Sequence, residues 1–292
     1  MIKPGIPEAA NEIVVTDRRL LACLEDGQPD IGTLWELCMY FEFDREETAD
    51  GIAAWLGEPR GQRILDCACG SGFPALELIR RGYDVTCTDG SEMMLRHFRR
   101  NARIEGLDIK PVLLDWADLP GRYDREFDVV INRGGGNYIY AGVWEEEGLA
   151  AESAMAEAIG QWAACVRPGG RLYVDTTRAQ DLDRTEPQIV RHPTMVIGDH
   201  RVDIVEQVSI DRVRRRRAWE SELTVDGVRT NFRRRSHYIR HEQLLAALRD
   251  LGLEGIRREP IRGEFYDVYT ATRPGGPGSA GRPVATEEVP DR

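Results

Sequence analysis

The order of apolar and polar residues predicts alternating strands and helices between residues 63 and 176. Helical patterns at 74–81, from Ser91 onward and at 149–165 separate short apolar runs that have the length of buried strands. These strand-like runs are 63–67, 84–88, 110–114, 127–131 and 171–176. Alternation of this kind is typical of an α/β doubly wound fold, with a parallel sheet between two layers of helices.

Beyond residue 177 the pattern changes to extended segments without intervening helices. Residues 202–210, 218–225 and 228–238 have β character, and Asp226-Gly227 suits a tight hairpin turn with positive φ. We expect them to form an antiparallel insertion at the carboxyl edge of the sheet. A helix at 242–251 and a strand around 264–272 would then complete the core.

These patterns divide the chain into five segments. They are an aromatic-rich N-terminal segment (1–50), a cofactor-binding core (51–178) that begins with a helix at 46–56, an antiparallel β insertion (179–240), a closing helix and strand (241–273), and a tail (274–292). The tail is rich in Gly and Pro with mixed charge, so we expect it to be disordered.

The segment that follows the first predicted strand points to a nucleotide cofactor. That strand ends in Asp66, and the chain then bends through Gly70 and Gly72 into a helix. Glycine allows a sharp turn and close approach of a ligand, and amides at the start of the helix face whatever lies over the loop. The run 70–75 also satisfies the G-x-G-x-x-G/A dinucleotide fingerprint, so NAD is an alternative. An acid placed before the glycines favours a cationic ligand instead.

Polar residues that end four successive strands should converge, because parallel strands present their carboxyl ends at one edge. These residues are Asp66, Asp89, Asp115 with Trp116, and Asn132 to Tyr138. Asp89 follows Asp66 near the spacing expected for an acid that binds ribose hydroxyls. Helix capping is the alternative for Asp89, and a core tryptophan beside a loop acid is the alternative for Trp116.

Residues 63–78 resemble motif I of class I S-adenosylmethionine (SAM)-dependent methyltransferases, with Ala68 in place of the first glycine. Asp89-Gly-Ser-Glu-Met-Met-Leu95 resembles the D-x-S-x-x-M-L segment of the same family, and Arg167-Pro-Gly-Gly170 resembles its turn before the fifth strand. The resemblance covers about residues 60–177. It implies a seven-stranded Rossmann-like sheet with an antiparallel β insertion forming a cap, and SAM as cofactor with S-adenosylhomocysteine (SAH) as product.

The resemblance also implies the cofactor contacts. Asp66 would face the cationic end of SAM, Asp89 the ribose, and Asp115 and Trp116 the adenine, by a hydrogen bond and by stacking. The full predicted set is Asp66, Ala68, Gly70, Gly72, Asp89, Gly90, Met94, Asp115, Trp116, Asn132 and Arg133.

The segment after the fourth strand, Asn132-Arg-Gly-Gly-Gly-Asn-Tyr138, bears on the methyl acceptor. It lacks the prolines of the N/D-P-P-Y/F segment that nucleic-acid base methyltransferases place there. It resembles the R-G-N-S segment of glycine and glycine/sarcosine N-methyltransferases, with Tyr138 replacing Ser. Arg178 falls near, though not at, the position of the arginine that binds the substrate carboxylate in those enzymes. Ser236-His-Tyr238 is similar to their C-terminal half, and the N-terminal aromatic segment is comparable to their lid.

These observations predict a SAM-dependent small-molecule N-methyltransferase that methylates the amine or guanidine of an amino acid, such as glycine, sarcosine or arginine, by in-line transfer. Arginine is included because the chain is acidic and Glu264 and Asp267 lie near the last strand. The predicted acceptor-site residues are Asn137 and Tyr138 to orient the amine, Arg178 to anchor a carboxylate, and Tyr40 and Tyr238 as an aromatic wall.

Close enzymatic alternatives are an amino-sugar N-methyltransferase and an O-methyltransferase of a secondary-metabolite pathway. From other functional classes, the alternatives are an NAD oxidoreductase, an RNA-binding protein and a SAM-binding module without turnover. His237 would act either as a proton acceptor or as an exposed strand histidine.

Charge and cysteine content narrow the partners. The formal net charge of −11 argues against a general nucleic-acid binder, since phosphate contacts need a basic surface. The arginine runs 212–217 and 233–235 form either an RNA-contacting patch or ion pairs with acids such as Glu220 and Glu222. The resemblance is compatible with a homo-oligomer.

We expect no membrane segment and a cytoplasmic location, since no apolar run approaches roughly 18 residues and the N-terminus lacks a signal-peptide pattern. We also expect no disulfide framework and no structural metal, because Cys67-Ala-Cys69 has no second pair at zinc-like spacing.

Overall fold

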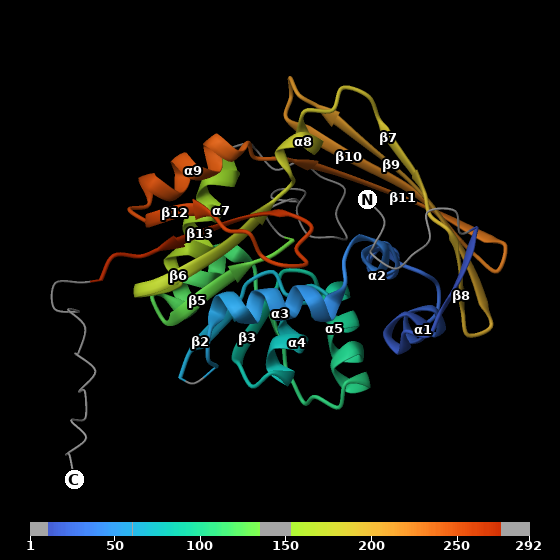
Figure 1. Cartoon of the computed structure of the whole chain (residues 1–292), viewed down its shortest axis with the longest axis horizontal. Coiled ribbons are helices and arrows are strands. Elements are labelled where there is room, and N and C mark those ends of the chain that lie inside the picture. The colour runs from blue at the N-terminus through green and yellow to red at the C-terminus, as the bar shows by residue number, and fades with distance from the viewer. Residues whose placement is uncertain (1–10, 60, 135–152, 276–292) are drawn as a thin grey trace, which may run out of the picture.

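The computed structural model describes residues 11–59, 61–134 and 153–275, which form two β-sheets with helices around them (Figure 1). The larger sheet has seven strands in the order β12-β13-β6-β5-β2-β3-β4. Its strands are β2 (Arg63–Asp66), β3 (Asp84–Asp89), β4 (Val112–Leu113), β5 (Phe127–Asn132), β6 (Val166–Thr176), β12 (Glu254–Arg258) and β13 (Asp267–Thr272). Strands β2 to β6 are parallel to one another, whereas β13 is antiparallel to both β6 and β12. The doubly wound α/β prediction is confirmed.

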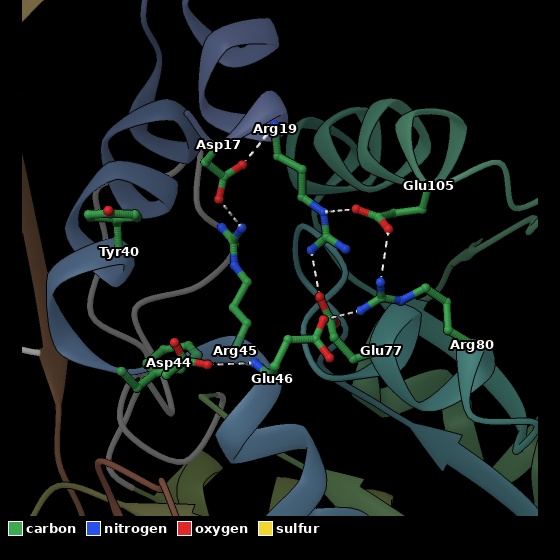
Figure 2. Close-up of a pocket in the computed structure, with 10 residues that line it drawn as sticks. Asp17, Arg19, Tyr40, Asp44, Arg45, Glu46, Glu77, Arg80 and Glu105 are labelled. Carbon is green, nitrogen blue, oxygen red and sulfur yellow. Dashed lines mark hydrogen bonds and ion pairs between the residues drawn. The ribbon is translucent and has the colours of Figure 1, made fainter. Parts of the chain in front are cut away.

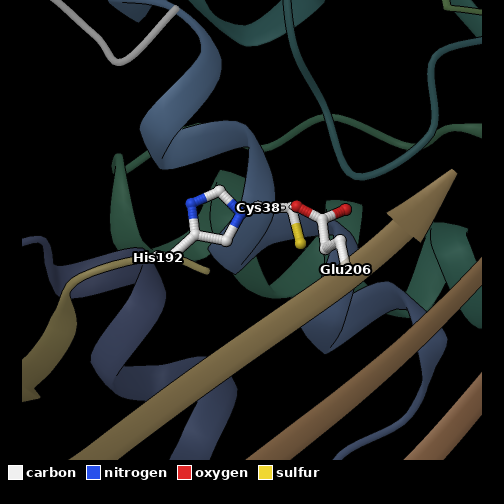
Figure 3. Close-up of side chains that lie close together, drawn as sticks. All are labelled: Cys38, His192 and Glu206. Carbon is white, nitrogen blue, oxygen red and sulfur yellow. Dashed lines mark hydrogen bonds and ion pairs between the residues drawn. The ribbon is translucent and has the colours of Figure 1, made fainter. Parts of the chain in front are cut away.

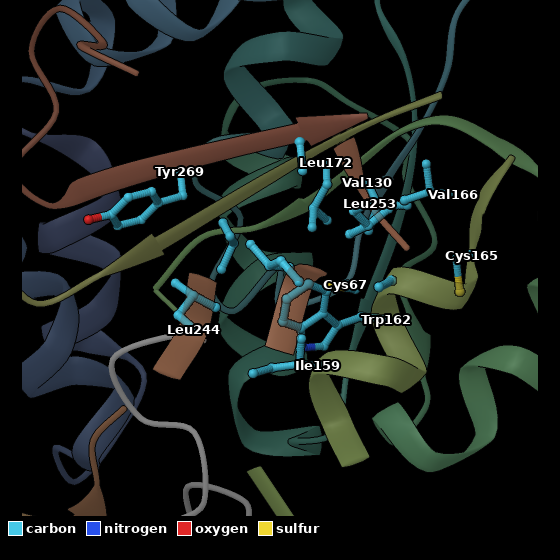
Figure 4. Packing of buried hydrophobic residues seen from close by; sticks show 14 of the residues in the cluster. Cys67, Val130, Ile159, Trp162, Cys165, Val166, Leu172, Leu244, Leu253 and Tyr269 are labelled. Atoms are coloured by element: carbon cyan, nitrogen blue, oxygen red, sulfur yellow. The ribbon is translucent and has the colours of Figure 1, made fainter. Parts of the chain in front are cut away.

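Helices cover both faces of this sheet because successive strand residues point to opposite sides. Ile64 packs with α3 (Arg45–Leu56) and α4 (Ala75–Arg80), and α5 (Glu92–Ile104) extends this layer. Leu65, the next residue, packs on the other side with α7 (Ser153–Ala164) and α9 (His241–Asp250). Figure 4 shows this second cluster around the fully buried Trp162. The short helices η1 (Trp116–Asp118) and α6 (Leu119–Tyr123) precede β5.

The second sheet has six strands in the order β1-β8-β9-β10-β11, and β7 also pairs with β9. Its strands are β1 (Glu12–Val15), β7 (Gln188–Arg191), β8 (Thr194–Ile197), β9 (His200–Asp211), β10 (Arg216–Val225) and β11 (Val228–His237); α8 (Ala179–Leu182) precedes them. Asp226 and Gly227 have φ of 51° and 82°, so the predicted tight hairpin turn is confirmed. Strands β7 to β11 follow the carboxyl end of β6, whereas β1 comes from the N-terminal segment. The sheet lies beside the larger sheet in Figure 1.

Helices α1 (Arg18–Glu25) and α2 (Ile31–Glu42) pack their apolar residues on the second sheet. Leu34, Leu37 and Phe41 of α2 lie in this cluster with Trp219 and Leu223 of β10. The aromatic N-terminal segment is therefore a helix that belongs to the core of the second sheet.

Several predicted elements differ from the observed ones. The strand predicted at 110–114 is reduced to Val112–Leu113, since Pro111 cannot donate a ladder hydrogen bond. The last predicted strand starts at Asp267 rather than near 264, and β1, β7, β8 and β12 were not predicted. The start of the helix expected at 149–165 and most of the tail, 276–292, lie outside the described residues.

Arginines of both runs form ion pairs with acids of the second sheet, which was one of the two alternatives for these runs. Arg233 pairs with Glu220 across β10 and β11 at 3.0 Å, and Arg214 pairs with Asp211 at 3.1 Å. All six cysteines are free and buried. In the described parts of the chain, no helix combines the length and apolar character needed to cross a membrane.

Candidate functional site

The acids that end β2 and β3 lie beside the glycine loop, as the topology requires. The loop amide of Gly70 donates to Asp89 Oδ2 at 2.8 Å, and the amide of Ser91 donates to Asp89 Oδ1 at 2.9 Å. Ser91 itself caps α5 by accepting from the amide of Met94. Asp89 therefore braces the loop against the start of α5 rather than capping the helix. Its contact with a ribose stays a prediction.

Two buried acceptors without a hydrogen-bond partner mark the centre of this edge. Asp66 is 1% exposed and uses Oδ1 to accept from the amide of Ala68, while its Oδ2 has no partner. Asn132, fully buried at the end of the adjacent strand β5, donates through Nδ2 to Cys67 Sγ and leaves its Oδ1 without a donor. Such orphaned acceptors are costly unless a ligand supplies the missing donors.

The buried position of Asp66 also affects its protonation. Burial, reinforced by the nearby charge of Asp89, raises the pKa of Asp66 to about 8. A carboxyl group in this state becomes a carboxylate when a cation binds beside it, because an opposite charge favours the ionised form. The position is suited to an ammonium or sulfonium group.

The conformation of the glycine loop excludes larger residues at its second glycine. Gly72 has φ of 120°, and a Cβ there would lie 2.5 Å from Leu76 Cδ1. From α5, Asn101 Nδ2 donates to the carbonyl of Ser71 at 2.9 Å and to Glu36 Oε1 of α2 at 3.2 Å. A single amide group thus ties the loop to α2.

The predicted adenine-binding pair lies on the side of the loop next to β4. The indole Nε1 of Trp116 donates to the carbonyl of Cys67 at 2.6 Å, and the ring packs on the cluster that contains Trp162. Asp115 is exposed at the start of η1. Met94 is buried, within van der Waals reach of Gly70, and Gly90 and Ala68 are half-buried. The contact of Asp115 and Trp116 with adenine stays a prediction, as does the contact of the other three residues with the cofactor.

Arg133, predicted to contact the cofactor, has other partners in the structure. Its guanidinium makes two hydrogen bonds to Glu264, at 2.8 and 3.0 Å, and lies 4.5 Å from the ring centres of both Phe43 and Phe73. Arg133 and Glu264 are both buried, and the hydroxyl of Tyr173 also donates to Glu264. The structure therefore supports a bracing role for Arg133, which joins the loop after β5 to the segment before β13.

This ion pair corrects the argument for a guanidine substrate. Glu264 is already occupied by Arg133, and Asp267 accepts from Arg258 and from the amide of Ala179 at 3.2 Å. The charges of both carboxylates are already balanced by arginines of the chain, which weakens the case for a bound arginine.

The predicted acceptor-site residues are distributed over several elements. Arg178 follows the carboxyl end of β6, where its Nε donates to Asp181 at 2.8 Å and its guanidinium stacks on Phe265 at 4.5 Å. Tyr238, next after β11, is 3% exposed. His237 is also buried, contrary to the exposed alternative, and its Nδ1 has no hydrogen-bond partner. Asn137 and Tyr138 lie outside the described residues.

Tyr40 lies in the wall of a separate charged cavity of about 240 Å³ between α1, α2 and the helices of the core (Figure 2). The lining residues are Asp17, Arg19, Tyr40, Phe43, Asp44, Arg45, Glu46, Glu77, Arg80 and Glu105. Buried Arg19 pairs with Glu77 at 2.7 Å and with Glu105 at 3.0 Å, and Arg45 pairs with Asp17 at 2.9 Å. These ion pairs join α1 to α4, to the end of α5 and to the start of α3.

Sequence reasoning did not identify Phe43, Phe73, Asn101 or Glu36 as parts of this region. Phe43 belongs to the aromatic N-terminal segment, which was a usable signal, and its ring lies 4.8 Å from that of Phe73 in the glycine loop. Nothing local marks Asn101 or Glu36, whose roles depend on how α2 packs on α5.

Taken together, the site fits SAM on grounds internal to the chain. Asp66 and Asn132 carry orphaned acceptors at the ends of adjacent strands, Asp89 lies beside the loop, and the glycines leave the backbone open to close approach. A seven-stranded α/β sheet is the architecture that the class I methyltransferase resemblance implied.

Comparison with known proteins supports the same class. Residues 64–170 match a family model described as a methyltransferase domain. Glycine N-methyltransferase from Homo sapiens is 32% identical over 175 residues, covering 54% of this chain and 57% of that protein. Glycine/sarcosine N-methyltransferase from Halorhodospira halochloris is 42% identical over 94 residues, covering 31% of this chain and 35% of that protein. The chain therefore spans roughly a third to just over half of the length of these relatives.

Among solved structures, the sugar N-methyltransferase KedS8 from a Streptoalloteichus species superposes with a TM-score of 0.59. The superposition covers 79% of this chain and 88% of that chain at 20% identity, so it shows a shared fold. The chain thus contains a methyltransferase domain at residues 64–170, and the matches support a class I SAM-dependent methyltransferase with SAM as the cofactor.

Proposed function

We propose that the chain transfers a methyl group from SAM to the amine of a small amino acid such as glycine or sarcosine. The observation that carries the cofactor half of this proposal is the pair of unpartnered acceptors, Asp66 Oδ2 and Asn132 Oδ1, at the ends of adjacent parallel strands. The acceptor half is supported by the names of the relatives, glycine and glycine/sarcosine N-methyltransferases.

In this proposal the residues of the core bind and orient the cofactor. Asp66 and Asn132 accept from its ammonium group, Asp89 accepts from the ribose hydroxyls, and Asp115 and Trp116 hold the adenine. Bound SAM supplies a methyl group on a sulfonium, which is a good leaving group. Because the electrophile is already activated, the protein has mainly to align the incoming amine and exclude water, and alignment can lower a barrier by roughly 7–11 kcal/mol in favourable cases.

Arg178 is our candidate for the carboxylate anchor of the amino acid. It follows the carboxyl end of β6, which is parallel to β5 and β2, so it lies at the same edge of the sheet as Asp66. Its contact with Asp181 and its stacking on Phe265 hold the guanidinium in a fixed orientation. A substrate carboxylate would compete with Asp181 for the same cation.

Asn137 and Tyr138 remain proposed as the residues that orient the amine, and Tyr238 as part of the substrate wall. The uncharged amine is the nucleophile, so a dedicated base is needed only if the amine arrives protonated. The buried Nδ1 of His237, which has no hydrogen-bond partner, makes this imidazole the available acceptor of that proton.

An amino-sugar N-methyltransferase is the second candidate. It is favoured by the fold shared with the sugar N-methyltransferase KedS8 over 79% of this chain. An amino sugar carries no carboxylate, so the two candidates differ in whether Arg178 matters for the acceptor.

Steady-state kinetics of Arg178→Ala test the acceptor assignment. The variant should raise KM for an amino-acid acceptor at least tenfold and change KM for SAM by less than twofold, because only the acceptor meets the guanidinium. Arg184→Ala is the matched control, since Arg184 also pairs with Asp181, at 3.1 Å, but lies on the exposed side. Equal effects on both substrates, or the same effect in the control, would remove Arg178 from the site.

A further inference from the structure

Three side chains of the kinds that bind metal ions meet between α2 and the second sheet (Figure 3). Cys38 comes from α2, His192 follows β7, and Glu206 lies in β9. One donor atom from each lies within 4.8 Å of the other two. Cys38 and Glu206 are 1% and 8% exposed, and the side chain of His192 is 3% exposed.

We infer that this cluster binds a divalent metal ion, with Zn²⁺ as the ion that its donors favour. A thiolate, an imidazole and a carboxylate are the three ligand types that Zn²⁺ takes in proteins, at about 2.3, 2.0 and 2.1 Å. Ca²⁺ and Mg²⁺ prefer oxygen ligands, so the Cys and His donors select against them.

Neighbouring side chains hold two of the three ligands in place. The indole Nε1 of Trp219 donates to Glu206 Oε2 at 2.6 Å, which leaves Oε1 turned toward His192. The ring of Phe41 stacks on the imidazole with centres 4.3 Å apart and planes 24° apart. Contacts that orient ligands in this way commonly tune metal affinity.

The ion-free cluster shows what binding must change. His192 Nε2 and Glu206 Oε1 are 2.5 Å apart and share a proton in a hydrogen bond. Around a tetrahedral ion these two atoms would separate to about 3.3 Å. The ion replaces the Cys38 thiol proton and the Nε2 proton, so binding releases protons and leaves the thiolate and carboxylate charges balanced by Zn²⁺.

The fourth ligand position can be filled from α2 or by water. Glu42 lies one helical turn after Cys38 and therefore on the same face of α2. With the three ligands drawn from α2, the turn after β7 and strand β9, the ion would clamp the N-terminal helix to the second sheet. This role is separate from methyl transfer and does not depend on the proposed acceptor.

This inference departs from the expectation of no structural metal, which rested on the spacing of Cys67 and Cys69. The three residues of this cluster are far apart in the sequence, so no short sequence motif contains them.

The test is metal analysis of the full chain, purified through a tag without histidine and without chelators, followed by Co²⁺ titration of the metal-free protein. We expect about one equivalent of bound metal per chain. We also expect a thiolate-to-Co²⁺ charge-transfer band and the intense visible bands of a tetrahedral site. Cys38→Ser and Glu206→Gln should lose both the metal and the band. Cys23→Ser is the matched control, because Cys23 is also buried and lies 3.7 Å from the Nδ1 of His97.

Trp219→Phe keeps all three ligands and should weaken Co²⁺ affinity by about 10- to 100-fold, which protects the test if the ligand variants fail to fold. A wild-type protein that is purified without metal and gives no charge-transfer band on titration would overturn the inference. Retention of the band in Cys38→Ser, or unchanged affinity in Trp219→Phe, would also overturn it.

Discussion

Asn101 offers a direct test of the link between α2 and the cofactor loop. It is fully buried, and its Nδ2 donates both to the carbonyl of Ser71 in the loop and to Glu36 Oε1 of α2. Glu36 also accepts from Arg45 at 2.5 Å, so the same carboxylate is anchored on a second side. We expect Asn101→Leu to weaken SAH binding as well as folding, because the loop loses the donor that holds Ser71.

The size of each effect follows from the groups left behind. Two buried acceptors lose their donor, at about 1–3 kcal/mol each. Asn101 Oδ1 is itself buried without a partner, and its removal recovers a similar amount. The expected loss of unfolding free energy is therefore about 1–3 kcal/mol. For binding, one neutral hydrogen bond to the loop is worth about 1 kcal/mol, which corresponds to about fivefold in the Kd of SAH.

The assay is isothermal titration of SAH together with urea unfolding of the same preparations. Asn231→Leu serves as the control, since Asn231 is exposed on β11. If Asn101→Leu lowers stability but binds SAH with an unchanged Kd, Asn101 is only a packing residue and the coupling does not exist.

Three further predictions concern the loop, the acid before it and the core. Between pH 4 and 8 the folded chain keeps a proton on Asp66 that the unfolded chain has lost, because the pKa of Asp66 in the folded chain is raised to about 8. Asp66 therefore lowers the free energy of unfolding as the pH rises through this range. Asp66→Asn should make this decrease smaller, as measured by urea unfolding at pH 5, 6.5 and 8. An unchanged slope would show that Asp66 is ionised throughout. Gly72→Ala should weaken SAH binding more than tenfold in the same titration. The added Cβ would clash with Leu76, and the positive φ of this position costs a residue other than glycine about 1–3 kcal/mol. An affinity equal to that of the wild type would contradict the loop geometry. Trp162→Ala should lower the free energy of unfolding by about 3–5 kcal/mol, because it empties a fully buried site. Trp162→Phe should lower it by less than about 1.5 kcal/mol, because the indole Nε1 has no hydrogen-bond partner to lose. Similar losses in both variants would indicate a hydrogen bond to the indole.

The sequence was sufficient to predict the parts of the fold whose signal is local. Apolar runs bounded by turn residues gave the parallel strands, and Asp226-Gly227 gave the hairpin between β10 and β11. The glycine loop was also recognisable, because both the positive φ of Gly70 and Gly72 and the neighbouring acid are requirements on residue type.

What could not be predicted depends on contacts distant in sequence. Strand β1 is four residues long and pairs in parallel with β8, whose first residue is Thr194. The two strands are far apart in the sequence, so no local pattern predicts their pairing. Arg133 follows β5 directly and therefore resembled a cofactor residue. Its partner Glu264 lies 131 positions later and became visible only when β13 was placed beside β6.

The central claim is that this chain methylates a small amine with SAM, and an acceptor screen tests it most directly. The purified protein would be incubated with SAM and a mixture of glycine, sarcosine, other amino acids and simple amino sugars, and the products followed by mass spectrometry. We expect SAH formation with a one-methyl mass gain on an amino acid, glycine or sarcosine first. Tight SAH binding without a methylated product from any amine would contradict it, and would leave a SAM-binding protein of another function.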